Sequence, residues 1–258
     1  MRAVRWLRRL CAAAVAAVVA LAASAAEAPQ ADAAAPMHTE LLKTGLYLIS
    51  GGGANSMLRL SAQGLILVDA KPDASYRALR AEMRRVNKIS DLPLRVLLLT
   101  NPEDSHSGGA ARFLAAGVPI VVPAGKHFAI EAAPAASAAS APGGRPVAAV
   151  TTFEQRYDIA LGGATVRLLH FGRARGASDV VVWFPDLKVV AVGELYTTGE
   201  PQPIVAEGGS RAAWAAAVGE ILKLDFDLVV PANGPPIHRA ELEAFWAARL
   251  AGAETPQR

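Results

Sequence analysis

Short runs of hydrophobic residues separated by small polar residues predict an antiparallel meander early in the chain. Segments that contain glycine, serine or asparagine separate the runs at residues 46–49, 57–60 and 65–68. Residues of this kind end strands and form the tight turns between them. We therefore expect three consecutive strands that pair with their neighbours.

The pattern then changes to a mixture of helix and strand. Apolar residues spaced by three and four predict a helix over about 75–87, with Asp73 as its cap. Residues 94–99 form a continuous apolar run, which is typical of a strand buried on both faces. A helix over about 108–116 and a strand over 118–122 complete a βαβ unit.

The second half of the chain continues with strands and two helices. A helix over about 211–223 is expected to be capped by Ser210, and a final helix covers about 238–250. Residues 131–149 hold nine alanines with proline, serine and glycine, which predicts a flexible insertion. The expected strands are 157–161, 166–170, 180–184, 189–192 and 228–230.

The N-terminus differs in composition from the rest and has the features of an export signal. Four arginines precede the 14-residue apolar run 10–23, and small side chains follow it at 23–25. The run is shorter than the ~20 residues of a membrane span. We expect a signal peptide at 1–25, an Ala/Pro-rich tether at 26–39, one domain over 40–252, and a periplasmic or secreted protein without a transmembrane span.

Removing that segment changes the charge of the protein. The whole chain carries a net charge of +3, but residues 26–258 hold 22 basic and 23 acidic side chains. A general affinity for nucleic acid is therefore not expected. The single cysteine, Cys11, lies within the predicted signal, so the mature chain is expected to contain no disulfide.

A polar cluster follows the buried strand at 94–99 and precedes Gly-Gly and a helix. Open α/β sheets bind ligands at the carboxyl ends of their strands, so this cluster is the first candidate site. Residues 100–109 read T-N-P-E-D-S-H-S-G-G. This segment resembles the metallo-β-lactamase superfamily pattern Thr-His-x-His-x-Asp-His-x-Gly-Gly, with Asn101, Glu103 and Ser105 in place of two histidines and the aspartate, and His106 retained.

Later landmarks of the same family follow in order. Asp69 ends a strand, as the family's structural aspartate does. Arg175 stands at the position of the third metal-binding histidine, Glu194 at that of the metal-bridging aspartate, and Asn233 at that of the last histidine. The resemblance covers about residues 40–250 and implies an α+β (α/β) fold, a four-layer αββα sandwich with its site along one edge of the two sheets.

The resemblance also implies where two zinc ions would bind. The first would fall on Asn101, Glu103 and Arg175, and the second on Ser105, His106 and Asn233, with Glu194 between them. Zinc prefers imidazole, thiolate or carboxylate ligands, and a guanidinium has no lone pair to donate. We expect at most one divalent metal ion, and a contact from Arg175 to Glu103, Glu194 or both in place of the first metal.

Two functions follow from these substitutions. The first is a non-catalytic binding or accessory protein, a pseudoenzyme, which recognises a small anionic ligand or a protein partner. The alternative is a divergent hydrolase that uses a single metal, or a metal-free pair with Glu103 or Glu194 as base and His106 as acid. Metal content is the most informative measurement, because about one zinc or manganese ion per chain favours the second function and none favours the first.

Export can be tested directly. The N-terminal sequence of the protein recovered from the periplasm or medium should begin near Ala26 or Glu27. A mature chain that still begins at Met1 and resists extraction of membranes with carbonate would contradict a cleaved signal and favour an anchor.

Overall fold

The computed structural model describes residues 36–125, 128, 130, 149–197 and 207–253. These described residues form one compact unit. The predicted signal at 1–25, nearly all of the tether and nearly all of the insertion at 131–149 lie outside the described residues.

Seven strands form the first sheet, in sequence order across the sheet. The first four are antiparallel neighbours, and β4, β5, β6 and β7 run parallel to one another. The expected meander and βαβ unit are therefore present. The strands are β1 (His38–Lys43), β2 (Leu46–Ser50), β3 (Ser56–Ser61), β4 (Gly64–Val68), β5 (Leu94–Leu98), β6 (Ile120–Pro123) and β7 (Val150–Phe153).

Six strands form the second sheet, in the order β13-β12-β11-β10-β9-β8. All its neighbours are antiparallel except β11 and β12, which are parallel. The strands are β8 (Arg156–Leu161), β9 (Ala164–Leu169), β10 (Val181–Phe184), β11 (Val189–Gly193), β12 (Leu228–Pro231) and β13 (Ile237–His238).

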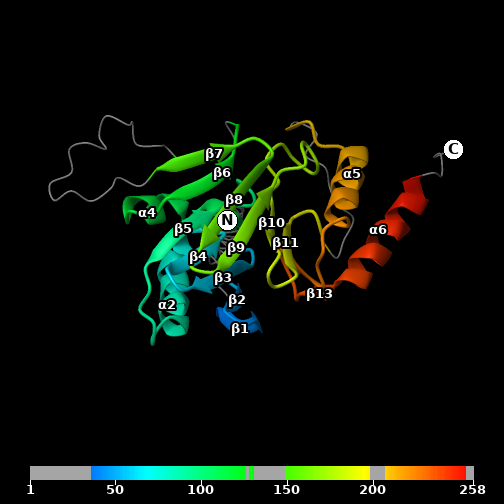
Figure 1. The fold of residues 1–258 in the computed structure, drawn as a ribbon. Coiled ribbons are helices and arrows are strands. Elements are labelled where there is room, and N and C mark those ends of the chain that lie inside the picture. The colour runs from blue at the N-terminus through cyan, green and yellow to red at the C-terminus, as the bar shows by residue number, and fades with distance from the viewer. Residues whose placement is uncertain (1–35, 126–127, 129, 131–148, 198–206, 254–258) are drawn as a thin grey trace, which may run out of the picture. The chain divides into compact units, whose positions relative to one another are not determined.

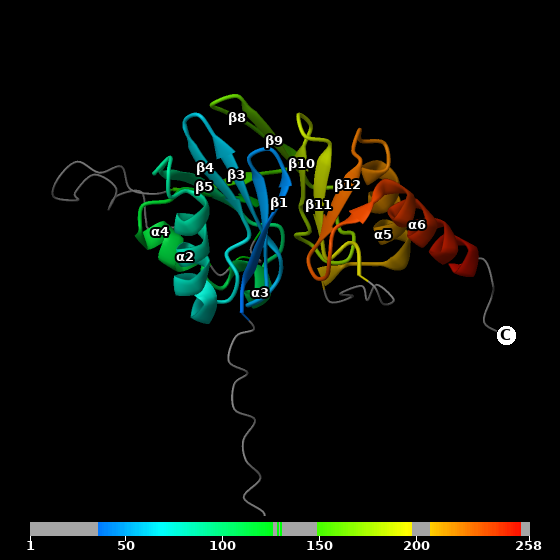
Figure 2. The ribbon, with the colours of Figure 1, turned by 90° about the horizontal axis from the view of Figure 1, so that it is seen from below.

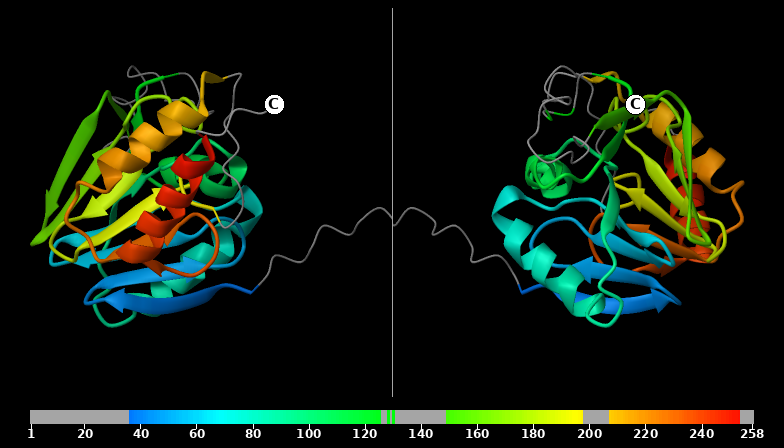
Figure 3. Two further views of the ribbon diagram at one scale, coloured as in Figure 1. Left: turned by 90° about the vertical axis from the view of Figure 1, so that its right-hand side faces the viewer. Right: turned by 60° about the vertical axis from the view of Figure 1, so that its left-hand side comes forward.

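Helices cover the outer faces of the two sheets (Figures 1 and 2). On the first sheet lie the 3-10 turn η1 (Asp73–Ser75), α2 (Tyr76–Val86) and α4 (Ala110–Ala115), and α3 (Asp104–Ser107) lies at its edge. On the second lie α5 (Arg211–Ile221) and α6 (Arg239–Ala253), as Figure 3 shows.

Three separate apolar clusters correspond to the three interfaces of this four-layer sandwich. The central cluster joins Met57 and Ile66 of the first sheet to Val182 of the second. A second cluster packs Leu79 and Phe113 from the helices onto the first sheet, and a third packs the α5 residue Trp214 onto the second. The expected α+β sandwich is confirmed, because each sheet has one apolar face for its partner sheet and one for its helices.

The structure differs from the sequence-based expectations at several element boundaries. Strand β1 begins at His38 and so crosses the boundary expected between tether and domain, and β7 and β13 were not predicted. One helix was expected over 108–116, but two short helices, α3 and α4, flank Gly108-Gly109. Asp73 makes no cap hydrogen bond and instead pairs with Arg112, whereas Ser210 caps α5 as expected, accepting from the amide of Ala213.

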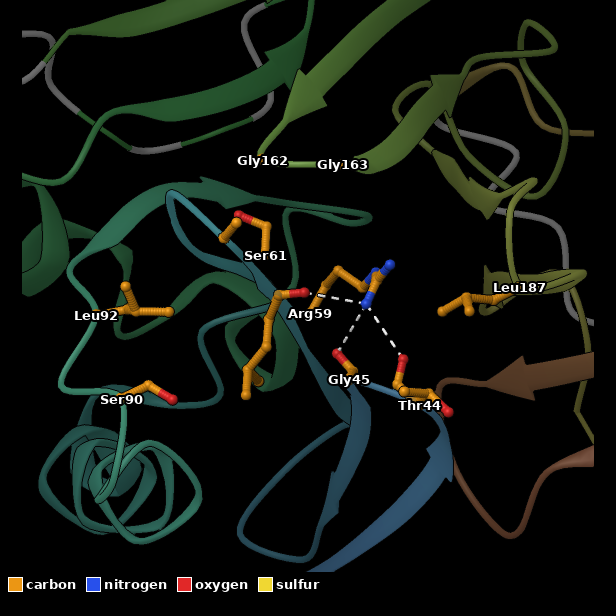
Figure 4. A pocket seen from close by; sticks show the side chains of 11 residues that line it. Thr44, Gly45, Arg59, Ser61, Ser90, Leu92, Gly162, Gly163 and Leu187 are labelled. Carbon is orange, nitrogen blue, oxygen red and sulfur yellow. Dashed lines mark hydrogen bonds between the residues drawn. The ribbon is translucent and has the colours of Figure 1, made fainter.

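At the strand ends farthest from the polar cluster, Arg59 joins the two sheets. Its Nη1 donates to the carbonyls of Thr44, Gly45 and Leu60, and its Nη2 lies 2.7 Å from a carboxylate oxygen of Asp186. Arg59 points into a hollow of about 560 Å³ (Figure 4). Because Nη1 contacts the first sheet and Nη2 contacts Asp186 between β10 and β11 of the second, we interpret Arg59 as a structural link.

No helix in the described ranges is long and apolar enough to cross a membrane. This finding concerns residues 36–253 with their gaps, and it does not extend to the N-terminal segment.

The loop at Gly51–Gly53 provides a test of the packing near the polar cluster. Gly53 has φ +125°, and a Cβ there would overlap the ring of Pro72 and lie 3.1 Å from the carbonyl oxygen of Ser105. We expect Gly53→Ala to lower the free energy of unfolding by backbone strain of about 1–2 kcal/mol plus about 1–3 kcal/mol of overpacking, measured by urea unfolding.

Gly163→Ala is the matched control. Its φ is +85°, but a Cβ there would meet nothing within 4 Å. Only the loss from backbone strain is therefore expected in this variant. Equal losses in the two variants would show that the contact of the loop with Pro72 is not close.

Candidate functional site

The candidate site lies where strands of both sheets end. Asp69 follows β4, Thr100 and Asn101 follow β5, Glu194 follows β11, and Asn233 follows β12. Main-chain bonds hold these ends together: the amide of Val180 donates to the Thr100 carbonyl at 2.8 Å, and that of Asn55 donates to the Ala232 carbonyl at 2.6 Å. The sequence therefore brings side chains that are more than 160 positions apart to one edge of the sandwich.

Asp69 lies at the centre of the hydrogen-bond network in the buried part of the site. Its side chain is almost fully buried and accepts hydrogen bonds from the Thr100 amide at 2.8 Å and the Thr100 hydroxyl at 2.6 Å. The same carboxylate lies 2.8 Å from Nδ1 of His106. Asp69 adopts φ +61°, an uncommon conformation for a residue with a side chain. The network fixes the end of β4, the end of β5 and α3 relative to one another.

His106 connects Asp69 to Glu194. Its ring is fully buried, with Nε2 at 3.3 Å from Glu194 Oε1. Burial alone would lower the pKa of His106, but the charge of Asp69 and the hydrogen bonds to Asp69 and Glu194 outweigh it and raise the pKa to about 10. The hydrogen bond from His106 lowers the pKa of Glu194. We infer that His106 is an imidazolium between two carboxylates at neutral pH.

Arg175 makes the expected contact with Glu103. Its Nη1 donates to Glu103 Oε1 at 2.8 Å, and the side chains are 17% and 40% exposed, respectively. Burial acts to lower the pKa of Arg175, but the hydrogen bond and charge of Glu103 raise it overall, with a smaller contribution from the charge of Glu194. No hydrogen bond joins Arg175 to Glu194 within the described residues, so of the alternatives expected the structure has the contact to Glu103 alone.

Asn101 and Asp179 form a second buried pair that sequence reasoning missed. Asn101 Nδ2 donates to Asp179 Oδ1 at 3.1 Å, and its Oδ1 accepts from the amide of Glu103 at 2.8 Å. Asp179 also accepts from the amide of Gly176 at 2.6 Å, and burial raises its pKa. The only sequence signal was an acidic residue placed directly before the apolar strand at 180–184, four residues beyond Arg175.

Lys71 is the second residue that sequence reasoning missed. Its side chain is completely buried and donates to the carbonyls of Ile49 and Ala54, at 2.9 and 2.7 Å. Burial lowers its pKa to about 8, against the opposing effect of the charge of Asp69. Lys71 therefore ties the glycine loop at 51–53 to the segment that carries Asp69.

The remaining predicted positions are placed more loosely. Asn233 is exposed, and its Nδ2 lies 3.3 Å from Glu194 Oε1. Ser105 contributes its carbonyl, which accepts from the Ala54 amide at 3.1 Å. His170 Nδ1 lies 3.0 Å from the carbonyl oxygen of Asp179. The structure thus links His106, Glu194 and Asn233 in one group and Glu103 with Arg175 in another.

The chemistry of these residues does not fit the di-zinc centre that the resemblance implies. No group of three or more histidine, cysteine, aspartate or glutamate side chains is arranged to hold a metal ion among the described residues. The imidazole of His106 is engaged at both nitrogens, and the guanidinium of Arg175 adds a fixed positive charge beside Glu103. A second cation at that position would be repelled.

The fold and the order of the strand-end residues define a class of protein. The sequence profile of the metallo-beta-lactamase superfamily matches residues 49–233. The chain belongs to this superfamily, whose members include hydrolases.

Solved structures of that class share the fold. The metallo-beta-lactamase from Pontibacter korlensis has a TM-score of 0.65 and 19% identity, covering 83% of this chain and 99% of that one. The metallo-beta-lactamase FIM-1 from Pseudomonas aeruginosa, in its mono-zinc form, has a TM-score of 0.63 and 20% identity, covering 86% and 97%.

A relative in sequence is the 2,4-dinitroanisole O-demethylase subunit alpha of Nocardioides sp. (strain JS1661). It is 24% identical over an alignment of 225 residues that covers 84% of this chain. The match spans 64% of that protein's length, so this chain is similar to a part of it.

The imidazolium predicts a specific pH dependence of stability. The pKa of His106 is about 10 in the folded protein, above its ordinary value of 6.5, so the folded state binds more protons between these values. The stabilisation is complete below pH 6.5 and is lost as pH rises through 10. Lys71, with its pKa lowered to about 8, acts in the opposite direction only above pH 8.

We therefore expect the free energy of unfolding to fall between pH 6.5 and 8, and His106→Gln to remove this slope. Glu194→Gln should leave an intermediate slope, because Asp69 still faces the ring. Urea unfolding at intervals of half a pH unit measures all three proteins. Equal slopes in the wild type and His106→Gln would show that the imidazole is neutral in the folded state.

Proposed function

We propose that this chain is an exported metallo-beta-lactamase-fold protein whose di-zinc site has been replaced by ion pairs, and that it binds a ligand or partner without hydrolysing it. The observation that carries the proposal is the contact between Arg175 and Glu103. These two residues stand at positions where the resemblance places ligands of the first zinc ion, and they neutralise each other at 2.8 Å.

The second zinc position supports the same interpretation. There the imidazolium of His106 lies between Asp69 and Glu194. Each metal position therefore contains an internal cation facing a carboxylate. Such an arrangement preserves the balance of charge at the edge of the two sheets, but it leaves no metal-bound hydroxide to attack a substrate.

Arg175 is the part of the site suited to recognition. Its side chain is 17% exposed, and only Nη1 is engaged with Glu103. A guanidinium presents five donors in a rigid fork, which suits a carboxylate or phosphate group. A small anionic ligand or an acidic side chain of a protein partner could use the remaining donors.

The divergent-hydrolase alternative has one observation in its favour. His106 Nε2 and Glu194 Oε1 are 3.3 Å apart, within reach for proton transfer between an acid and a base. The name of the Nocardioides relative describes an enzyme subunit, which keeps this alternative open at 24% identity. Against it, the ring of His106 is completely buried and its other nitrogen is held by Asp69.

Metal analysis of the protein purified without chelator tests the proposal. We expect well below one equivalent of zinc or manganese per chain by plasma mass spectrometry, and no hydrolysis of a chromogenic cephalosporin. About one tightly held ion per chain would overturn the proposal in favour of the hydrolase.

Restoring the ligands provides the matched experiment. The triple variant Asn101→His, Glu103→His and Arg175→His should gain about one zinc per chain, because three imidazoles and a water complete a tetrahedral set. Arg175→His alone supplies one imidazole and should remain without strong binding. Zinc binding that is equal in the single and triple variants would contradict the assignment of these positions. Circular dichroism of each variant confirms that it is folded.

A further inference from the structure

A stripe of basic side chains runs along the outer face of α2, away from the candidate site's residues. Arg77, Arg80 and Arg84 recur at helical spacings of three and four, and Lys88 continues the same face in the turn that follows α2. At 1.5 Å per residue the stripe is about 16 Å long. Figures 1 and 2 show α2 on the outside of the molecule.

The charges of this stripe are not neutralised by the protein. Among the described residues, no hydrogen bond or ion pair connects Arg77, Arg84 or Lys88 to a carboxylate, and Arg80 donates only to the Tyr76 hydroxyl at 3.3 Å. The carboxylates of α2 and of the 3-10 turn before it are bound elsewhere. Glu82 accepts from Thr39 and Arg85, and Asp73 pairs with Arg112.

The surface between these arginines is hollowed and partly aromatic. A hollow of about 450 Å³ is lined by Arg77, Arg80, Arg84, Tyr76 and Ala116. The guanidinium groups of Arg80 and Arg112 lie 5.9 and 5.5 Å from the centre of the Tyr76 ring. Aromatic contact of this kind favours a position beside the ring for Arg80, which belongs to the stripe, and for Arg112, which adjoins it.

An exposed apolar residue lies beside the end of the stripe. Ile89 follows Lys88 directly and is 99% exposed. A large apolar side chain that contacts nothing is informative when it adjoins a polybasic face, because this combination is typical of surfaces that rest on a lipid bilayer. An extended nucleic acid would use the charges but would leave the isoleucine in water.

We propose that this face, formed by Arg77, Arg80, Arg84, Lys88 and Ile89, binds the anionic surface of a lipid bilayer. The four cations would meet lipid phosphates along the length of the stripe, and Ile89 would enter the interfacial region. The near-neutral charge of residues 26–258 means that attraction to such a surface would come from this local stripe. This proposal uses residues outside the candidate site and does not depend on the function proposed for it.

Vesicle co-sedimentation tests the proposal with the mature chain. We expect binding to vesicles of 30% phosphatidylglycerol in phosphatidylcholine and none to pure phosphatidylcholine, with the affinity falling as salt rises. Each cation near such a surface strengthens binding about fivefold. The triple variant Arg77→Gln, Arg80→Gln and Arg84→Gln should therefore bind about 100-fold more weakly, and Ile89→Asn should weaken binding by a smaller factor.

The matched control removes the same charge from other parts of the surface. Lys43, Arg156 and Lys223 are exposed cations of β1, β8 and the end of α5, and the triple variant to glutamine at these positions should bind as the wild type does. Thermal melting of both triple variants confirms that they remain folded.

Three results would overturn the proposal. The first is no binding of the wild type to the anionic vesicles at low salt. The second is equal loss in the two triple variants, which would indicate net charge alone. The third is tighter binding to a 20-nucleotide DNA duplex or to polyglutamate than to the vesicles, which would assign the surface to a different polyanion.

Discussion

The edge of the sandwich depends on the hydrogen bonds that the carboxylate of Asp69 makes. This carboxylate accepts hydrogen bonds from the amide and the hydroxyl of Thr100, which follows β5, and it contacts the ring of His106 in α3. A buried carboxylate without such donors would be costly, so each donor is needed for the fold as well as for the site. These contacts hold the ends of β4 and β5 and the short helix α3 in fixed positions relative to one another. The position of Glu194 opposite His106 follows from that arrangement.

The two halves of the site, one around Arg175 and one around His106, have the same kind of charge balance. In each half a buried or half-buried basic side chain faces a carboxylate supplied by the other sheet: Arg175 faces Glu103, and His106 faces Glu194. Removing one partner of a buried pair costs more than the pair contributes as a whole. The partial exposure of Glu103 reduces that cost for the first pair. This arrangement lets a superfamily scaffold keep its two sheets closed along an edge that is rich in acidic side chains.

The sequence predicted the layers of the fold better than it predicted their boundaries. The runs at 46–49, 57–60 and 65–68 were correct because glycine-rich turns separate them clearly. Strand β1 was missed, since its polar, exposed residues resemble the tether before it. The contact of Arg175 with Glu103 could be expected from the family positions. The roles of Asp179 and Lys71 could not, because their burial is created by loops that are distant in sequence.

Lys71 gives the glycine loop a property that is unusual for a surface segment. The ammonium group lies completely out of solvent and is held by the carbonyls of Ile49 and Ala54, which lie on either side of Gly51–Gly53. A primary amine that is sealed in this way can react with an acylating reagent only while the loop is open. The rate at which Lys71 Nζ is acylated in the native protein therefore measures how often this loop opens.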